Sequence, residues 1–135
     1  MKKLDLNKAA EEFEMIGSET HLFYNTETGE FDFYSDFMVF DEDGEEKFEE
    51  NCWIAAPNRR DIDEYDMMTR FAEAVTDPRA NELLCVALEG RGAFRRFKDT
   101  LHRIGKTDGW YAIKREAYID LAREWCDDNG IPYFR

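Results

Sequence analysis

Short runs of strand-forming residues follow one helical segment in the first half of the chain. In residues 6–16 hydrophobic residues recur at helical spacing, and Asp5 stands before them as a candidate N-cap, which predicts a short amphipathic helix. Two aromatic-rich runs, 21–25 and 31–35, flank a polar turn that contains a glycine, so this region predicts a β-hairpin. Residues 52–56 predict a third strand, because a proline follows them and ends the run.

The segment between the hairpin and the third strand is acidic. Residues 37–40 extend the second strand of the hairpin or begin another strand. The run 41–46 has the carboxylates and the glycine that a calcium loop uses, but it lacks the register of such a loop. The pattern therefore predicts an acidic turn.

After Pro57 the hydrophobic period becomes helical and stays helical almost to the end of the chain. The four amphipathic segments are 61–75, 77–88, 93–104 and 108–129. We expect the first of them to start at Asp61, the second at Asp77 with a proline next to it, and the last at Asp108. A glycine follows each of the last two helices, which suits a helix C-terminus.

Strands in one block and helices in another are typical of the α+β class. We expect a small antiparallel sheet of about three strands packed with about five helices, with the helices mainly in the C-terminal half. The chain has 135 residues, the size of one ordinary domain, and neither a linker nor a repeat interrupts it. The sequence thus predicts a single domain over residues 1–135.

The amino-acid composition predicts where in the cell the protein is located. The chain carries 18 Lys or Arg against 31 Asp or Glu, a net charge of −13, yet 11 Phe, six Tyr and three Trp can supply a core. The three cysteines form no C-x-x-C pair, which favours reduced thiols. No run approaches the roughly 18 apolar residues of a membrane span. We expect a cytoplasmic protein that does not contact a membrane; the pattern leaves the oligomeric state open.

The charge is unevenly distributed along the chain. Residues 1–50 hold four Lys or Arg against 16 Asp or Glu, whereas residues 51–135 hold 14 against 15. Within residues 91–106 there are six basic residues and one acidic residue, a local balance of +5. Segregation of this kind favours surfaces with opposite binding preferences.

The basic segment is the candidate functional surface. Its apolar residues predict a buried side of the helix: Ala93, Phe94, Phe97, Leu101 and Ile104. The residues we assign to anion or partner binding are Arg91, Gly92, Arg95, Arg96, Lys98, His102 and Arg103. Of these, Arg95, Lys98 and His102 form one row along the helix, and Arg96 and Arg103 form a second. Because both aromatic residues of the helix fall on the apolar side, the pattern disfavours stacking of nucleic-acid bases on this surface.

The glycine-flanked Arg91 allows two interpretations. A helix N-terminus offers free amide groups, and arginines beside it add donors suited to phosphate or carboxylate. Alternatively, Gly90 and Gly92 permit a tight turn between two helices, and the arginines pair with acidic residues of the same chain. The tight turn has somewhat more support, because the strand–loop–helix context of a nucleotide motif is missing.

Residue types that carry catalysis or metal binding are sparse. His21 and His102 are the only histidines, and neither has a local partner at zinc-site spacing. A nucleophilic cysteine would need His102 to approach it in the fold. We therefore expect no metal and no cofactor, and we assign no catalytic residue.

Several motifs resemble one known family. They are Gly90–Leu101, Trp110-Tyr111, Glu124-Trp125-Cys126 and Asn129-Gly130-Ile131, with further similarity at Thr28-Gly29-Glu30 and between Ala55 and Tyr65. In these motifs, which span nearly the whole chain, the sequence resembles the bacterial uncharacterised protein family 0158. The resemblance implies a small cytoplasmic bacterial protein, and it implies no catalytic residue.

Three functional hypotheses follow. The first is a non-enzymatic binding or adaptor module that presents the basic helix to an acidic protein, a nucleic acid or an anionic metabolite. The second is that the acidic N-terminal half mimics nucleic acid and occupies a basic site on another protein. The third is a small enzyme that acts on a phosphorylated or carboxylated metabolite at the same helix, with His102 or an acidic residue as base.

Overall fold

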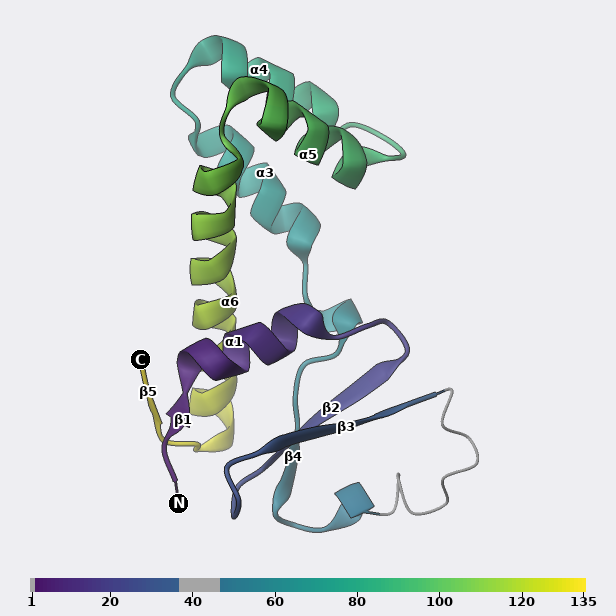
Figure 1. Cartoon of the computed structure of the whole chain (residues 1–135), viewed down its shortest axis with the longest axis vertical. Helices are drawn as coiled ribbons and strands as arrows, with labels where there is room; N and C mark the ends of the chain where they lie inside the picture. The colour runs from purple at the N-terminus through teal and green to yellow at the C-terminus, as the bar shows by residue number, and fades with distance from the viewer. Residues whose placement is uncertain (1, 37–46) are drawn as a thin grey trace. The chain divides into compact units, whose positions relative to one another are not determined.

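The computed structural model describes residues 2–36 and 47–135 (Figure 1). Within these residues it confirms the α+β class, with five α-helices, a three-stranded antiparallel sheet and a two-stranded parallel sheet. The predicted strand at 37–40 and the predicted acidic turn at 41–46 lie outside the described residues. The chain divides into two compact units, Met1–Ile62 with Tyr118–Arg135 (unit 1) and Asp63–Ala117 (unit 2). The expectation of a single domain stays a prediction.

Unit 1 begins with the predicted helix and hairpin. Helix α1, Leu6–Met15, starts where a carboxylate oxygen of its N-cap Asp5 accepts a hydrogen bond from the Asn7 amide at 2.9 Å. Strands β2, Thr20–Asn25, and β3, Phe31–Ser35, form the hairpin, and β4, Trp53–Ala55, pairs with the other edge of β2. The strand order is therefore β3-β2-β4, with every pairing antiparallel.

Aromatic side chains from three elements form the core of unit 1. The ring of Phe13 on α1 meets Trp125 at 5.4 Å and Phe31 at 6.2 Å, both edge to face, the geometry that aromatic pairs prefer. Trp125 also donates a hydrogen bond from Nε1 to the Ala55 carbonyl at 2.9 Å, which ties its helix to β4. On the other face of the sheet, Phe23 stacks on Phe48 at 4.3 Å, where Phe48 belongs to the 3₁₀ helix Lys47–Glu49.

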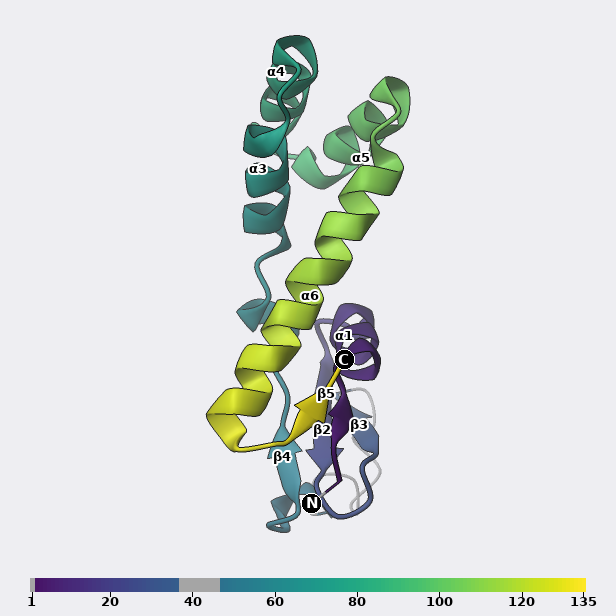
Figure 2. The ribbon, with the colours of Figure 1, turned by 90° about the vertical axis from the view of Figure 1, so that its left-hand side faces the viewer.

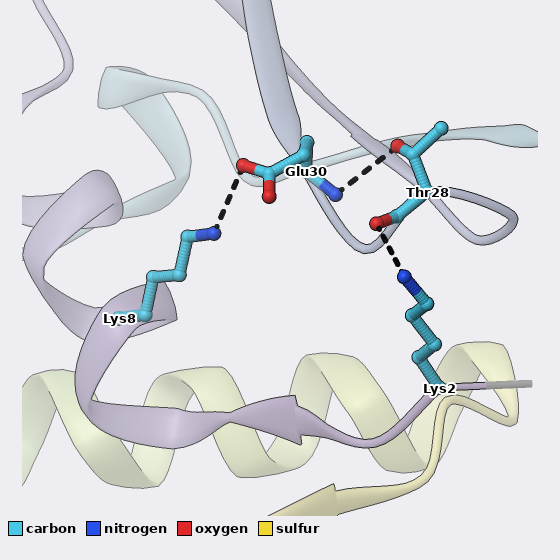
Figure 3. Close-up of polar contacts among 4 residues, drawn as sticks. All are labelled: Lys2, Lys8, Thr28 and Glu30. Carbon is cyan, nitrogen blue, oxygen red and sulfur yellow. Dashed lines mark hydrogen bonds and ion pairs between the residues drawn. The ribbon is translucent and has the colours of Figure 1, made fainter.

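The pattern along the chain did not predict the second sheet. Strands β1, Leu4–Asp5, and β5, Tyr133–Phe134, pair in parallel, so the first and last strands of the chain lie side by side (Figure 2). The N-terminal segment is also fixed to the β2–β3 turn (Figure 3). Lys8 Nζ lies 3.1 Å from Glu30 Oε2, and Lys2 Nζ donates to the Thr28 carbonyl at 3.4 Å.

The first helix of unit 2 starts two residues later than predicted. Helix α3 is Glu64–Ala74, and its N-cap is Asp63, whose side chain accepts from the Asp66 amide at 2.9 Å. The predicted N-cap, Asp61, instead ends the 3₁₀ helix Arg59–Asp61, where its carboxylate accepts from the Asn58 amide at 3.1 Å. Asp61 thus closes a capping box of its own and is not the start of α3.

Three further helices follow, and capping residues close in the sequence mark where they begin or end. Helix α4 is Pro78–Ala87, with Asp77 as N-cap and the proline in the first turn, as predicted. Helix α5 is Ala93–Ile104, and it ends at Gly105 in the left-handed conformation. Helix α6, Thr107–Asn129, places Asp108 inside its first turn, so the prediction of Asp108 as its N-cap was wrong. Residues 107–117 of α6 belong to unit 2 and residues 118–129 to unit 1.

The core of unit 2 consists of residues from all four of its helices: Met68, Ala72, Leu84, Leu88, Phe97, Leu101 and Trp110. Trp110 of α6 packs edge to face against Phe97 of α5 at 5.2 Å and against Phe71 of α3 at 5.6 Å. These contacts hold the buried side of α5 in place, so its opposite side is presented in a fixed direction within the unit.

Candidate functional site

Helix α5 carries the candidate site on the side opposite its core contacts. Ala93, Phe97, Thr100 and Leu101 are buried, which fixes the orientation of the helix. Four exposed side chains form what we name the cationic face: Arg91, Arg95, Lys98 and His102. Within the described part of the chain, no hydrogen bond or ion pair engages these four side chains. All four are exposed to solvent.

Arg96 belongs to the fold and not to the cationic face. Its Nε donates to the Ala87 carbonyl at 3.2 Å, and its two terminal nitrogens donate to the carbonyls of Arg91 and Glu89. Tyr65 donates its hydroxyl to the Leu88 carbonyl at 2.9 Å, so the free carbonyls at the end of α4 are bound one after another. A planar fork of donors suits this task, since one guanidinium can serve several carbonyls at once.

Gly92 makes room for that guanidinium. It is the N-cap of α5 with φ 76°, a left-handed conformation, and a Cβ there would lie 3.1 Å from Nη1 of Arg96. Gly90 is left-handed as well, with φ 72°. The two glycines therefore have a structural role in the turn between α4 and α5, which agrees with the tight-turn interpretation of the sequence.

Arg103 is the second member of the row that the fold uses. Its Nη2 donates to the hydroxyl of Thr100 at 3.4 Å, and Thr100 is itself buried. The five assigned residues within the helix thus divide by the row they occupy. The side chains of the row that contains Arg95 form no hydrogen bond or ion pair with described residues, whereas Arg96 and Arg103 bind backbone or side-chain oxygens of their own unit.

Phe94 corrects the expected buried side of α5. The side chain is 47% exposed, although the sequence pattern placed it with the core residues. Successive residues advance about 100° around a helix, so Phe94 lies at the border between the buried Leu101 and the exposed Lys98. A ring therefore stands beside the cationic face, which sequence reasoning missed. The sequence does contain one indication of this exposure: Phe94 lies at the edge of the apolar side of the helix, and Lys98 follows it one turn later on the same side.

The charge of the two units is unequal. Unit 1 contains eight Lys or Arg against 21 Asp or Glu and so carries the entire net charge of −13. Unit 2 contains ten basic and ten acidic residues and is neutral. The positive charge of the basic segment 91–106 is therefore balanced by acidic residues elsewhere in the same unit. Even so, none of the described acidic side chains pairs with the four residues of the cationic face.

The remaining candidate residues do not assemble into a reactive set. His102 and Cys85 share no hydrogen bond, and the Cys85 thiol donates to Asn81 at 3.6 Å. Burial raises the pKa of the Cys126 thiol to about 11, so this cysteine is protonated at neutral pH. His21 lies 2.8 Å from Asp36 and stacks on Tyr34. No group of three metal-ligating side chains occurs among the described residues.

Comparisons with known proteins add no relative. Neither protein-family models nor curated proteins nor solved structures match the chain. The similarity to protein family 0158 therefore stays a prediction. In the described part of the chain, no helix has both the length and the hydrophobicity that a membrane crossing requires.

Proposed function

We propose that this chain is a non-enzymatic binding or adaptor protein that presents the cationic face of α5 to an anionic partner. The observation that supports it most is the set of exposed cations without a partner among the described residues, in a protein of net charge −13. In so acidic a chain an exposed arginine has many potential partners, yet the side chains of Arg91 and Arg95 form no hydrogen bond or ion pair with any residue in 2–36 or 47–135. A bacterial cytoplasmic location and membership of protein family 0158 are parts of the same proposal.

The chemistry of the face suits phosphate or carboxylate groups. Guanidinium groups form bidentate, charge-assisted hydrogen bonds with both, and a lysine adds a point charge one turn along the helix. No side chain caps the N-terminus of α5, so the positive end of the helix dipole adds to the same field. Such a field steers an anionic partner toward the face and makes binding depend on salt.

The test compares two pairs of charge reversals. The first pair, Arg95→Glu with Lys98→Glu, alters the cationic face. The control pair, Arg70→Glu with Arg79→Glu, alters arginines of unit 2 whose side chains are 79% and 75% exposed. Both pairs take the net charge from −13 to −17, so a difference between them reports the location of the charge and not its total.

The assay is fluorescence anisotropy with two labelled polyanions, an oligonucleotide and a poly-glutamate peptide. We expect binding that weakens with salt, a loss of about tenfold or more in the first pair, and a change within about threefold in the control pair. Equal losses in the two pairs, or no binding of either polyanion, would overturn the proposal. Circular dichroism of each variant checks that the fold is intact.

A second candidate function rests on unit 1. Because that unit carries the whole net charge of −13, it suits a role as a mimic of nucleic acid that occupies a basic site on another protein. This function predicts capture of a cationic probe such as poly-lysine with the same affinity in the wild type and in the Arg95→Glu, Lys98→Glu pair. Loss of that capture in the pair would contradict it.

A further inference from the structure

We infer that the partner of the cationic face is a single-stranded nucleic acid, with one base stacked on the ring of Phe94. This inference rests on the proposed function and adds a ligand class to it. The observation behind it is the juxtaposition on α5 of an aromatic ring that is 47% exposed with the exposed cations Arg95 and Lys98.

The cations and the ring would bind two different groups of one ligand, the cations an anionic group and the ring a planar one. Lys98 and His102 lie one and two turns after Phe94 on the same side of α5, and Arg91 precedes the helix. From residue 94 to residue 102 the helix rises about 12 Å, which exceeds the rise of about 3.4 Å per nucleotide along one strand of B-DNA, so the face is long enough to meet more than one phosphate. Single strands are bound by this combination, a positively charged track for the phosphates with aromatic side chains on which bases stack.

The same arrangement fits an acidic protein surface less well. The centre of a protein interface is a cluster of apolar and aromatic residues with few charges. On α5, Phe94 is a single exposed apolar ring beside the polar side chains of the cationic face. A duplex fits less well too, because its bases are already stacked and only a splayed base can lie on an aromatic ring.

The unit that carries the cationic face has no net charge of its own. Unit 2 is neutral, with ten basic and ten acidic residues, so the acidic excess belongs to unit 1. At physiological ionic strength, charges separated by more than about 8 Å are largely screened from one another. Charges at the face itself therefore act on a bound phosphate more strongly than charges beyond this distance do.

The test uses the full chain and three labelled probes: an oligo-dT of about ten nucleotides, an abasic strand of the same length, and poly-glutamate. Three variants separate stacking from charge. Phe94→Ala removes the ring, Phe94→Leu keeps an apolar side chain without a π-face, and Phe94→Trp provides a ring whose fluorescence reports stacking. Since Phe94 is half exposed, the alanine and leucine variants are expected to fold, and circular dichroism of each variant is the check.

We expect Phe94→Ala and Phe94→Leu to weaken oligo-dT binding roughly 5-fold to 150-fold, the effect of one stacked base. The abasic strand should bind as weakly as oligo-dT binds the alanine variant and should not respond to that substitution. In Phe94→Trp, oligo-dT should quench the fluorescence of the new ring. With Arg91, Arg95 and Lys98 on phosphates, affinity should fall about 20-fold between about 50 mM and about 200 mM salt.

Several outcomes would overturn the inference while the proposed function stands. They are equal affinity for oligo-dT and the abasic strand, no effect of Phe94→Ala or Phe94→Leu, equal affinity for duplex DNA, and tighter binding of poly-glutamate than of oligo-dT. In each of these cases the loss caused by Arg95→Glu with Lys98→Glu would persist. If none of the polyanions binds, both the inference and the proposed function fail.

Discussion

Replacing Arg96 by alanine should loosen the turn between α4 and α5 while leaving the cationic face chemically intact. The substitution removes a guanidinium that donates to the carbonyls of Ala87, Glu89 and Arg91. A hydrogen bond from a charged donor contributes about 1.5–3 kcal/mol where it is protected from water, and much less where it is exposed. Only the bond to Ala87 is partly buried, so we expect a total loss of about 2 kcal/mol in local stability.

Hydrogen exchange of the backbone amides measures this loss where it occurs. A change of about 2 kcal/mol corresponds to roughly 30-fold faster exchange in peptides that cover residues 84–100. The neighbouring Arg95→Ala is the matched control, because the Arg95 side chain forms no hydrogen bond or ion pair with a described residue, and it should change exchange by less than about threefold. Arg96→Lys should rescue little, since an ammonium cannot span the carbonyls. Unchanged exchange in Arg96→Ala, or equal effects of the two alanine variants, would refute the structural role of Arg96.

Three further substitutions or conditions test the packing. Gly92→Ala should destabilise the chain by about 1–2 kcal/mol in urea unfolding, because φ is 76° and the new Cβ would crowd Arg96. The control, Gly109→Ala within α6, should cause no loss of stability, and equal effects of the two substitutions would contradict the prediction. Tyr24→Phe should leave stability unchanged or raise it by about 1 kcal/mol, because the buried hydroxyl has no partner among the described residues; a clear loss in a thermal melt would contradict it. The pKa of Cys126 is raised from 9.0 to about 11, so the folded state holds this proton more tightly than the unfolded state does. The resulting stability is fully present below pH 9 and is lost as pH rises toward about 11, by up to about 2–3 kcal/mol; a pH profile of unfolding as steep in Cys126→Ala as in the wild type would contradict this.

Elements whose signals are local could be predicted from the sequence. Asp5 before α1 and the Asp77-Pro78 pair before α4 each act within one helical turn, and both cap where expected. The start of α3 was wrong because two aspartates compete two residues apart. Asp61 is taken by a capping box with Asn58, and only Asp63 is left for the helix.

Pairing between distant segments could not be predicted in the same way. Strands β1 and β5 have two residues each and come from opposite ends of the chain, so neither contains enough residues to show a period. Their pairing depends on where the ends of α1 and α6 lie in unit 1, which is a property of the packed structure.

For the candidate site, the sequence predicts where positive charge lies but not which charges are free. Arg95 and Arg96 are neighbours with the same side chain, yet about 100° around the helix separates them, and only Arg96 reaches the carbonyls at the end of α4. The exposure of Phe94 depends in the same way on how far the packing against α3 and α6 extends around α5. Such distinctions arise from tertiary contacts, which a helical period does not contain.

The measurement that tests the central claim most directly is an NMR titration of the ¹⁵N-labelled full chain with oligo-dT at low salt. If the cationic face of α5 is the binding surface, the amide signals of residues 91–104 should shift together and saturably, and Arg95→Glu with Lys98→Glu should abolish the shifts. Signals that move mainly in unit 1, or that move neither with a large excess of oligo-dT nor with poly-glutamate titrated in its place, would contradict it.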